Sequence, residues 1–200
     1  MKAVTRERNP RGQGERLHAD LLDATVDLIA ASGSVEGVSL RAAAKGAGVS
    51  PMAVYNHFAD KEALLEAAVE HCWTEFRAVI AAARDEPDPA ARLRAAGDAY
   101  VRFALDQPGK YAVMFSGTTQ LRERAVPVGM SAFDDLVAMV TEVLGANHDD
   151  RDPRFVAAQV HTWLHGIVSL LACAPDGPWP TSEALLDDVV VRLGLGPPTE

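Results

Sequence analysis

The segment SLRAAAKGAGVSPMAVYNHF, Ser39 to Phe58, decides the fold of this 200-residue chain. Ser39 is a favoured N-cap for a short helix over residues 40–47, and Gly48 suits the left-handed backbone of a tight connection. Ser50 caps a second short helix with Pro51 at its first position, where proline is favoured. Two short capped helices joined this way predict a helix-turn-helix, whose second helix crosses the first and leaves its N-terminal end free.

The side chains of this segment divide into an apolar set and an outward set. The apolar set can form a small shared core: Leu40, Ala43, Ala44, Ala47, Val49, Val54 and Phe58. The outward set includes donors suited to phosphates and base edges: Arg41, Ser50, Pro51, Met52, Tyr55, Asn56, His57 and, just beyond, Lys61. The pattern alone leaves open an ordinary helical hairpin with a solvated face that binds nothing.

Helices are also predicted on both sides of this segment. Apolar residues recur at helical spacing from Leu17 to Ile29, and Asp60 caps a long helix that reaches Ile80. Further helices are predicted near residues 90–106, 108–116, 127–145, 153–174 and 182–193, separated by proline- and glycine-rich breaks. No segment shows the alternation of a strand. The expected fold is therefore all-α, with an N-terminal three-helix helix-turn-helix domain and a C-terminal helical domain.

Charge is distributed unevenly along the chain. The first 60 residues hold equal numbers of acidic and basic side chains, so the net charge of −9 lies entirely in residues 61–200. This balance disfavours binding of nucleic acid over the whole surface but allows a local basic face. We expect a flexible basic arm at residues 1–14, a helix-turn-helix domain at 15–62, a helical domain at 63–193 and a tail at 194–200.

The cysteines and the apolar runs indicate the cellular setting. Cys72 and Cys173 are too few for a disulfide framework, and their apolar helical surroundings favour plain core packing; whether they pair stays open. No apolar run approaches the roughly 20 residues needed to span a bilayer, and no signal peptide is evident. We therefore expect a cytoplasmic protein without a membrane partner.

Four motifs carry a resemblance to a known family: Ala31-Ser-Gly33, Val38-Ser-Leu-Arg-Ala-Ala-Ala44, the run from Ala47 to Phe58, and Asp60-Lys-Glu-Ala-Leu-Leu65. With them, residues 15–70 resemble the DNA-binding domain of the tetracycline-repressor (TetR) family of bacterial regulators. Ala43-Ala44 departs from the family, which more often has a larger aliphatic residue there. In residues 98–175, PGKYAVMF (Pro108–Phe115) and AQVHTWLHG (Ala158–Gly166) resemble a C-terminal subfamily marked by Trp, a spacer and His-Gly.

The resemblance implies a DNA-binding regulator that acts in the bacterial cytoplasm and on the nucleoid. The residues matching phosphate contacts are Tyr55, His57 and Lys61, and those near bases are Arg41, Pro51, Met52 and Asn56. The expected partner is double-stranded DNA with a palindromic operator. Reading it requires two heads about one helical turn apart, so we expect a homodimer through helices 154–174 and 182–193, although these helices could instead pack inside one subunit.

The middle helices are expected to enclose a pocket for an unknown small-molecule effector that releases a repressor from DNA. The candidate ligand-binding residues are aromatic or soft apolar groups with a few polar atoms: Phe103, Tyr111, Met114, Phe115, Phe133, Trp163 and His165, with Met130 and Met139 as further candidates. The alternative for each is ordinary core packing.

An enzymatic function has little support in the sequence. His161 and His165 share a helix face, as metal ligands might, but Thr162 stands where the H-E-x-x-H motif needs its glutamate, and no third ligand is evident. We expect no enzymatic activity, no metal and no cofactor. Two alternatives stay open: a helical metal-dependent enzyme using His161 and His165, and an activator of the same family that responds to a protein partner.

Overall fold

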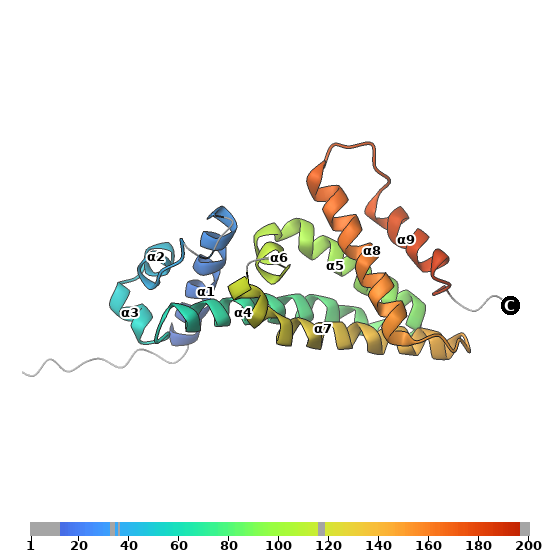
Figure 1. Ribbon diagram of the computed structural model, residues 1–200, viewed down its shortest axis with the longest axis horizontal. Coiled ribbons are helices and arrows are strands. Elements are labelled where there is room, and N and C mark those ends of the chain that lie inside the picture. The colour runs from blue at the N-terminus through green and yellow to red at the C-terminus, as the bar shows by residue number, and fades with distance from the viewer. Residues whose placement is uncertain (1–12, 33–34, 36, 116–118, 197–200) are drawn as a thin grey trace, which may run out of the picture.

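The computed structural model describes residues 13–32, 35, 37–115 and 119–196. Within these ranges the chain is helical and contains no strand, which confirms the all-α class. The elements are α1 (Gln13–Ser32), α2 (Leu40–Gly46), α3 (Pro51–Tyr55), α4 (Lys61–Ala81), the 3-10 helix η1 (Ala82–Asp85), α5 (Pro89–Asp106), α6 (Pro108–Phe115), α7 (Thr119–Ala146), α8 (Pro153–Cys173) and α9 (Ser182–Arg192). Figure 1 shows α2 and α3 at one end of an elongated molecule and α9 toward the other.

Local capping positions the two short helices. The Ser39 hydroxyl oxygen accepts a hydrogen bond from the Ala42 amide at 3.1 Å, and that of Ser50 accepts one from the Ala53 amide at 3.3 Å. Each bond satisfies an amide that a helix start would leave without a partner. Gly48 connects the helices with a φ of 69°, a left-handed conformation that strains any residue with a Cβ.

Small side chains let α1 and α2 cross closely. Ala43 and Ala44 are fully buried, and a Cβ on Gly46 would lie 2.9 Å from the Cβ of Ala24 on α1. The departure from the family pattern at Ala43-Ala44 is therefore accommodated by a tight crossing without loss of the helix-turn-helix geometry.

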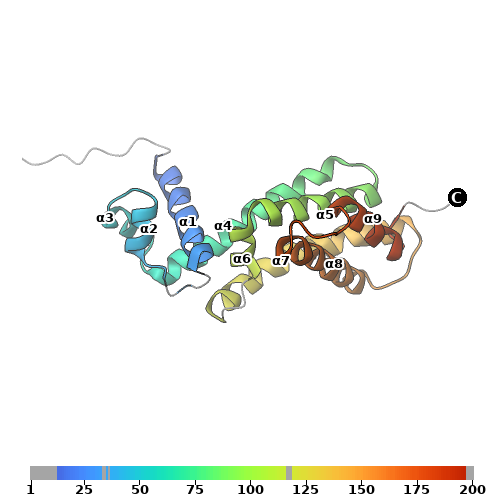
Figure 2. The same ribbon diagram turned by 90° about the horizontal axis from the view of Figure 1, so that it is seen from above.

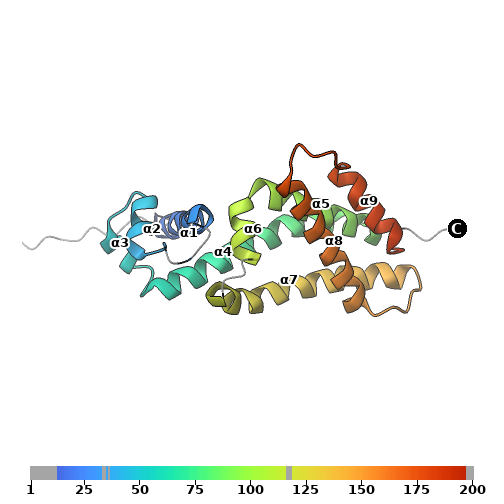
Figure 3. The same cartoon turned by 45° about the horizontal axis from the view of Figure 1, so that its top comes forward.

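α4 belongs to both halves of the molecule. Near its start, Leu64 and Leu65 are buried against the helix-turn-helix, whereas farther along Trp73 and Phe76 are buried in the second domain. Figure 2 shows α4 running from the α1–α3 group into the body formed with α5–α9. Figure 3 shows α7 running lengthwise along this body while α8 crosses it. A single helix thus connects a small head, α1–α3 with the start of α4, to the larger body.

The structure describes only a part of the expected N-terminal arm and of the expected C-terminal tail. Residues 1–12 of the expected arm lie outside the described residues, and Gln13 and Gly14 already belong to α1. Near the other end, Leu195 is only 1% exposed, and the Asn147 side-chain amide donates to the Gly196 carbonyl at 3.0 Å. The start of the expected tail, through residue 196, is therefore packed, while residues 197–200 lie outside the described part.

α8 corrects one expectation drawn from the sequence. By length and composition this 21-residue helix could cross a membrane, although no apolar run of that kind was expected. Core helices of soluble proteins meet the same criterion, but in α8 only 33% of the apolar stretch is buried within the described chain. α8 therefore has an apolar surface that one copy of this chain leaves open.

Candidate nucleic-acid interface and ligand cavity

α3 has a buried side and an exposed side. Val54 is fully buried, whereas Met52 is 69% exposed and Tyr55 is 58% exposed. Pro51 and Asn56 are exposed next to them. An apolar and an aromatic side chain that face solvent on so short a helix add nothing to the core, so this side of α3 is available to a partner.

Further predicted DNA-contact residues surround this exposed side. Arg41 is exposed on α2, and Lys61 is half-buried at the first residue of α4. The Ser50 oxygen caps α3 by accepting a hydrogen bond, so its own hydroxyl proton can still be donated. These residues all lie between positions 41 and 61, at the head end in Figure 1. Their contacts with DNA stay a prediction.

His57 has a neighbour that the sequence analysis did not single out. Its ring centroid lies 5.8 Å from that of His18 on α1, and the His18 ring stacks on Phe58 at 4.8 Å. Burial lowers the pKa of His18, and a charge on His57 would lower it further. His57 is therefore half-buried between the head core and the surface. Only the placement of α1 beside the turn that follows α3 brings the two histidines together.

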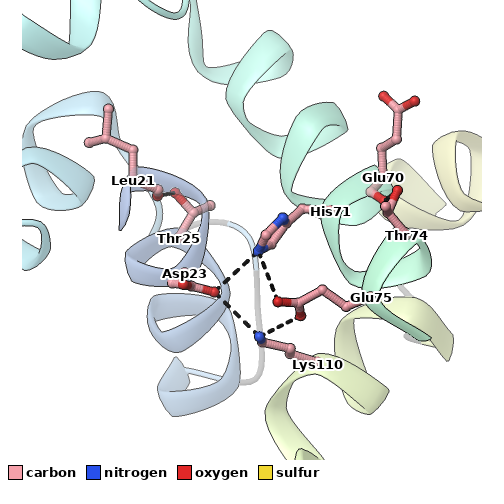
Figure 4. A network of polar contacts seen from close by, with 8 residues as sticks. All are labelled: Leu21, Asp23, Thr25, Glu70, His71, Thr74, Glu75 and Lys110. Atoms are coloured by element: carbon pink, nitrogen blue, oxygen red, sulfur yellow. Dashed lines mark hydrogen bonds and ion pairs between the residues drawn. The ribbon is translucent and has the colours of Figure 1, made fainter. Parts of the chain in front are cut away.

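A cluster of charged side chains joins the head to the body (Figure 4). The ammonium of Lys110 on α6 lies 2.5 Å from a Glu75 oxygen on α4 and 3.4 Å from an Asp23 oxygen on α1. His71 on α4 lies 3.3 Å from the same Asp23 oxygen. Burial opposes the charge on Lys110, but the hydrogen bond that its ammonium donates to Glu75 and the charges of the Glu75 and Asp23 carboxylates outweigh this effect and raise the Lys110 pKa. This cluster links three helices across the joint.

The body contains an open cavity of about 750 Å³, large enough for a sizeable small molecule. Its walls come from α4, α5, α6, α7 and α8 and are mainly apolar. They include Trp73, Phe76, Ile80, Leu93, Tyr100, Met114, Phe115, Met130, Phe133, Leu136, Met139, Val160 and Leu164, with Arg77, Asp135, Arg154 and His161 as the charged and titratable members.

The structure places only some of the predicted ligand-binding residues in these walls. Met114, Phe115 and Phe133 line the cavity, as do the further candidates Met130 and Met139. Four others do not: Phe103, Tyr111, Trp163 and His165. The sequence analysis in turn missed several wall residues, including Trp73, Phe76 and Arg77 of α4, because helical spacing shows which face is apolar but not whether another element fills the space beside it.

The four residues outside the walls differ in what they contact. Trp163 is 42% exposed on the outer face of α8. Phe103 is buried against the Phe76 ring, with centroids 5.4 Å apart. Tyr111 and His165 lie behind the wall, where the Tyr111 hydroxyl is 2.5 Å from Nδ1 of His165. A role of these four residues in ligand binding stays a prediction.

The polar groups of the cavity lie in two places. On one side, the Arg77 guanidinium pairs with Asp135 at 2.7 Å, and that of Arg154 pairs with Asp134 at 3.1 Å and lies over the Phe133 ring. Both arginines are partly exposed, so they mark the open side of the cavity. The second polar place is at His161. This residue lies seven residues after Arg154 on α8, which corresponds to about 10 Å along the helix axis.

His161 belongs to a hydrogen-bonded group of two histidines and two tyrosines. Its Nε2 lies 3.0 Å from Nε2 of His165, while the Tyr100 hydroxyl is 3.2 Å from that of Tyr111 and 3.4 Å from Nε2 of His165. Burial lowers the pKa of His161 to about 4 and also lowers that of His165. Burial raises the pKa of both tyrosines. All four side chains are therefore uncharged at neutral pH.

Possible metal ligands are few in the part of the chain that the structure describes. There, no further His, Cys, Asp or Glu joins His161 and His165 in a group of three. Asp23, His71 and Glu75 do have ligand atoms within 4.8 Å of one another. That cluster, however, already contains the Lys110 ammonium as its cation. The expected absence of a metal and of enzymatic activity stays a prediction.

Comparisons with known proteins agree with this architecture. Residues 21–68 match the model of the bacterial regulatory proteins of the tetR family, and residues 93–193 match that of the tetracyclin repressor-like C-terminal domain. A relative in Bacillus subtilis, the uncharacterized HTH-type transcriptional regulator YobS, is 29% identical over 155 residues, covering 76% of this chain and 77% of the relative.

Two solved structures share the fold. The fatty acid degradation regulator FadR from Bacillus halodurans aligns with a TM-score of 0.74 and 19% identity, over 94% of this chain and 96% of that chain. FadR from Bacillus subtilis in complex with stearoyl-CoA aligns with a TM-score of 0.72 and 16% identity, over 88% of this chain and 97% of that chain. The chain thus belongs to the tetR family and is a transcriptional regulator.

Proposed function

We propose that this regulator is a homodimeric repressor that binds a palindromic operator and is released by an amphipathic small molecule with an acyl chain. One observation carries the DNA-binding half of this proposal: the two-sided α3, with Val54 buried and Met52 and Tyr55 exposed. A short helix with a free outer face fits the major groove of DNA.

The contacts divide by chemistry into those that hold DNA and those that read its sequence. Tyr55, His57 and Lys61 donate to phosphate oxygens, which sets the register without reading bases. Arg41 reaches a guanine edge, and Met52 contacts a thymine methyl group. Pro51 lies beside Met52 as a further apolar contact, and Asn56 and Ser50 supply hydrogen bonds.

The outer surface of α8 and α9 supports a dimer. Phe155 and Trp163 on α8 are 64% and 42% exposed, and Val191 on α9 is 75% exposed. Between these two α8 residues and on the C-terminal side of Trp163, the exposed side chains are small, which permits close approach of a second helix. Pairing α8 and α9 with their symmetry mates gives a four-helix interface that buries this apolar surface. α8 is then covered by protein, which fits a repressor in the cytoplasm.

The cavity supports an amphipathic effector. Its apolar walls fit an acyl chain, and Arg77 and Arg154 on its open side can receive an anionic head group in exchange for their aspartates. The similar FadR fold in complex with stearoyl-CoA supports this ligand class. Binding favours a head spacing that does not fit the operator, and a coupling of about 1–3 kcal/mol changes DNA affinity roughly 5- to 150-fold.

The test begins with duplexes selected from a random library by the full chain. Fluorescence anisotropy then measures their affinity with and without stearoyl-CoA. We expect palindromic sites, two chains per duplex and weaker binding when the ligand is added. Arg41→Ala should relax preference at one base pair per half-site, while Arg102→Ala, which removes an exposed cation from the body, should change nothing. Selection of no common sequence would contradict the proposal.

A further inference from the structure

The inner polar end of the cavity has a feature that the proposed repressor mechanism does not use. His161 lies in the cavity wall, and its Nε2 faces His165. Its other ring nitrogen, Nδ1, has no hydrogen-bond partner among the residues described. His165 and Tyr111 lie behind it, and together with Tyr100, which is also in the cavity wall, they form a group of hydrogen bonds without any charged member.

Counting protons favours one direction for these hydrogen bonds. A neutral imidazole has one N–H donor and one acceptor nitrogen, and a tyrosine hydroxyl has one proton to donate. In one direction, Tyr100 donates to Tyr111, Tyr111 donates to Nδ1 of His165, and Nε2–H of His165 donates to Nε2 of His161. Each of these protons then has its own acceptor.

The opposite direction leaves a donor poorly placed. If His161 donates to His165 and His165 donates to Tyr111, then Tyr111 donates to Tyr100. The one acceptor then left for the Tyr100 hydroxyl proton in this group is Nε2 of His165, at 3.4 Å. The lone pair of that nitrogen, however, already accepts the hydrogen bond from His161. Because that nitrogen has a single lone pair in the ring plane, the first direction is favoured. It leaves the proton of His161 on Nδ1.

We infer that His161 Nδ1–H is a neutral hydrogen-bond donor site for a carbonyl oxygen of the effector, such as that of a thioester, ester or ketone. This inference rests on the proposed function only in taking the cavity as the effector site. A neutral donor suits a carbonyl because neither group brings a charge into the apolar interior. The arginines on the open side of the cavity can receive the charged end of the same molecule. Tyr111 and His165 are positioning residues that determine the tautomer of His161.

The first experiment needs no ligand. Long-range proton–nitrogen NMR spectra of the full chain with nitrogen-labelled histidine distinguish the two neutral tautomers and the charged ring. We expect Nδ1–H on His161 and Nε2–H on His165 at neutral pH, with signals assigned by their loss in His161→Gln and His165→Gln. Tyr111→Phe, which removes the donor to His165, should mix the tautomers of both rings. An Nε2–H tautomer or a charged ring at His161 would overturn the inference.

The second experiment compares two uncharged probes of the same shape. Methyl nonyl ketone carries the carbonyl, and in its matched alkene a CH₂ group replaces the oxygen. Headspace partitioning over the full chain measures the bound fraction of each. We expect the ketone to bind about three- to tenfold more tightly, since this is the range of one neutral hydrogen bond. His161→Leu should abolish the preference, and His161→Gln, which keeps an N–H donor, should restore it.

These outcomes separate the inference from the proposed function. Equal binding of the two probes, or binding of neither, overturns the carbonyl site even when DNA binding and release by stearoyl-CoA are normal. A ketone preference that depends on His161 supports the site even when no ligand releases DNA, and in that case only the repressor mechanism fails.

Discussion

Acidification should weaken this protein through His161, and the size of the effect follows from the burial of its ring. The His161 pKa is about 4 in the folded chain, against an ordinary value of 6.5, because burial disfavours the charged form. Between these two values the unfolded chain binds a proton that the folded chain does not. The free energy of unfolding therefore falls as the pH is lowered through this window, and it is unaffected by His161 above it.

The magnitude can be worked out at one pH. With the full lowering of the His161 pKa, the contribution of His161 to the free energy of unfolding falls by about 2 kcal/mol between neutral pH and about pH 5. The ring is only half-buried, so water screens part of this effect, and we expect a loss of about 1 kcal/mol. His165, which also has a lowered pKa, adds to the total loss in the unmodified protein.

Urea unfolding at about pH 7.5 and about pH 5 isolates the contribution of His161. His161→Gln keeps an acceptor for His165 but cannot titrate, so its stability should fall by about 1 kcal/mol less than that of the unmodified chain. His148→Asn is the matched control. This variant removes an exposed histidine, and asparagine tolerates the φ of 51° at that position. Its stability should therefore depend on pH as that of the unmodified chain does. Equal losses in all three proteins would refute the reasoning.

Three further predictions address the DNA contact, the cavity and the dimer. Lys61→Ala should weaken binding to all duplexes, and it should reduce the slope of log affinity against log salt concentration by about 1 for each DNA-binding head. Fluorescence anisotropy over a salt series measures this slope, and an unchanged slope would mean that Lys61 does not contact DNA. Gly129→Ala places a Cβ 2.9 Å from the Trp73 ring, so calorimetry should record weaker binding of stearoyl-CoA, and unchanged affinity would mean that Trp73 yields without cost. Phe155→Arg puts a charge on the exposed face of α8 and should give monomers in analytical ultracentrifugation, whereas a persisting dimer would place the interface elsewhere.

The head could be predicted from the sequence in some detail because its determinants are local. Ser39 and Ser50 cap helices through amides three residues away, and Gly48 supplies one positive φ, so neighbouring residues alone specify the turn. Its outward residues followed from the same helical spacing, and Met52 and Tyr55 are indeed exposed. His18 was missed because it reaches His57 only through the packing of α1.

The body was less predictable because its site depends on which helices meet. Met114, Phe115 and Phe133 line the cavity, but Trp163, on an equally apolar helix, faces out. A helical pattern records that a face is apolar without recording what covers it, so a core, a cavity and a subunit interface look alike in sequence.

The sequence by itself determined the order of the helices, the turn between the two short ones and the family of the chain, since caps, glycines and apolar spacing act over a few residues. Only the tertiary structure decided that Lys110 joins α6 to α1 and α4, that α4–α8 surround an open cavity, and that Tyr111 and His165 stand behind His161. These contacts join residues far apart in the chain, and their geometry depends on how whole helices pack.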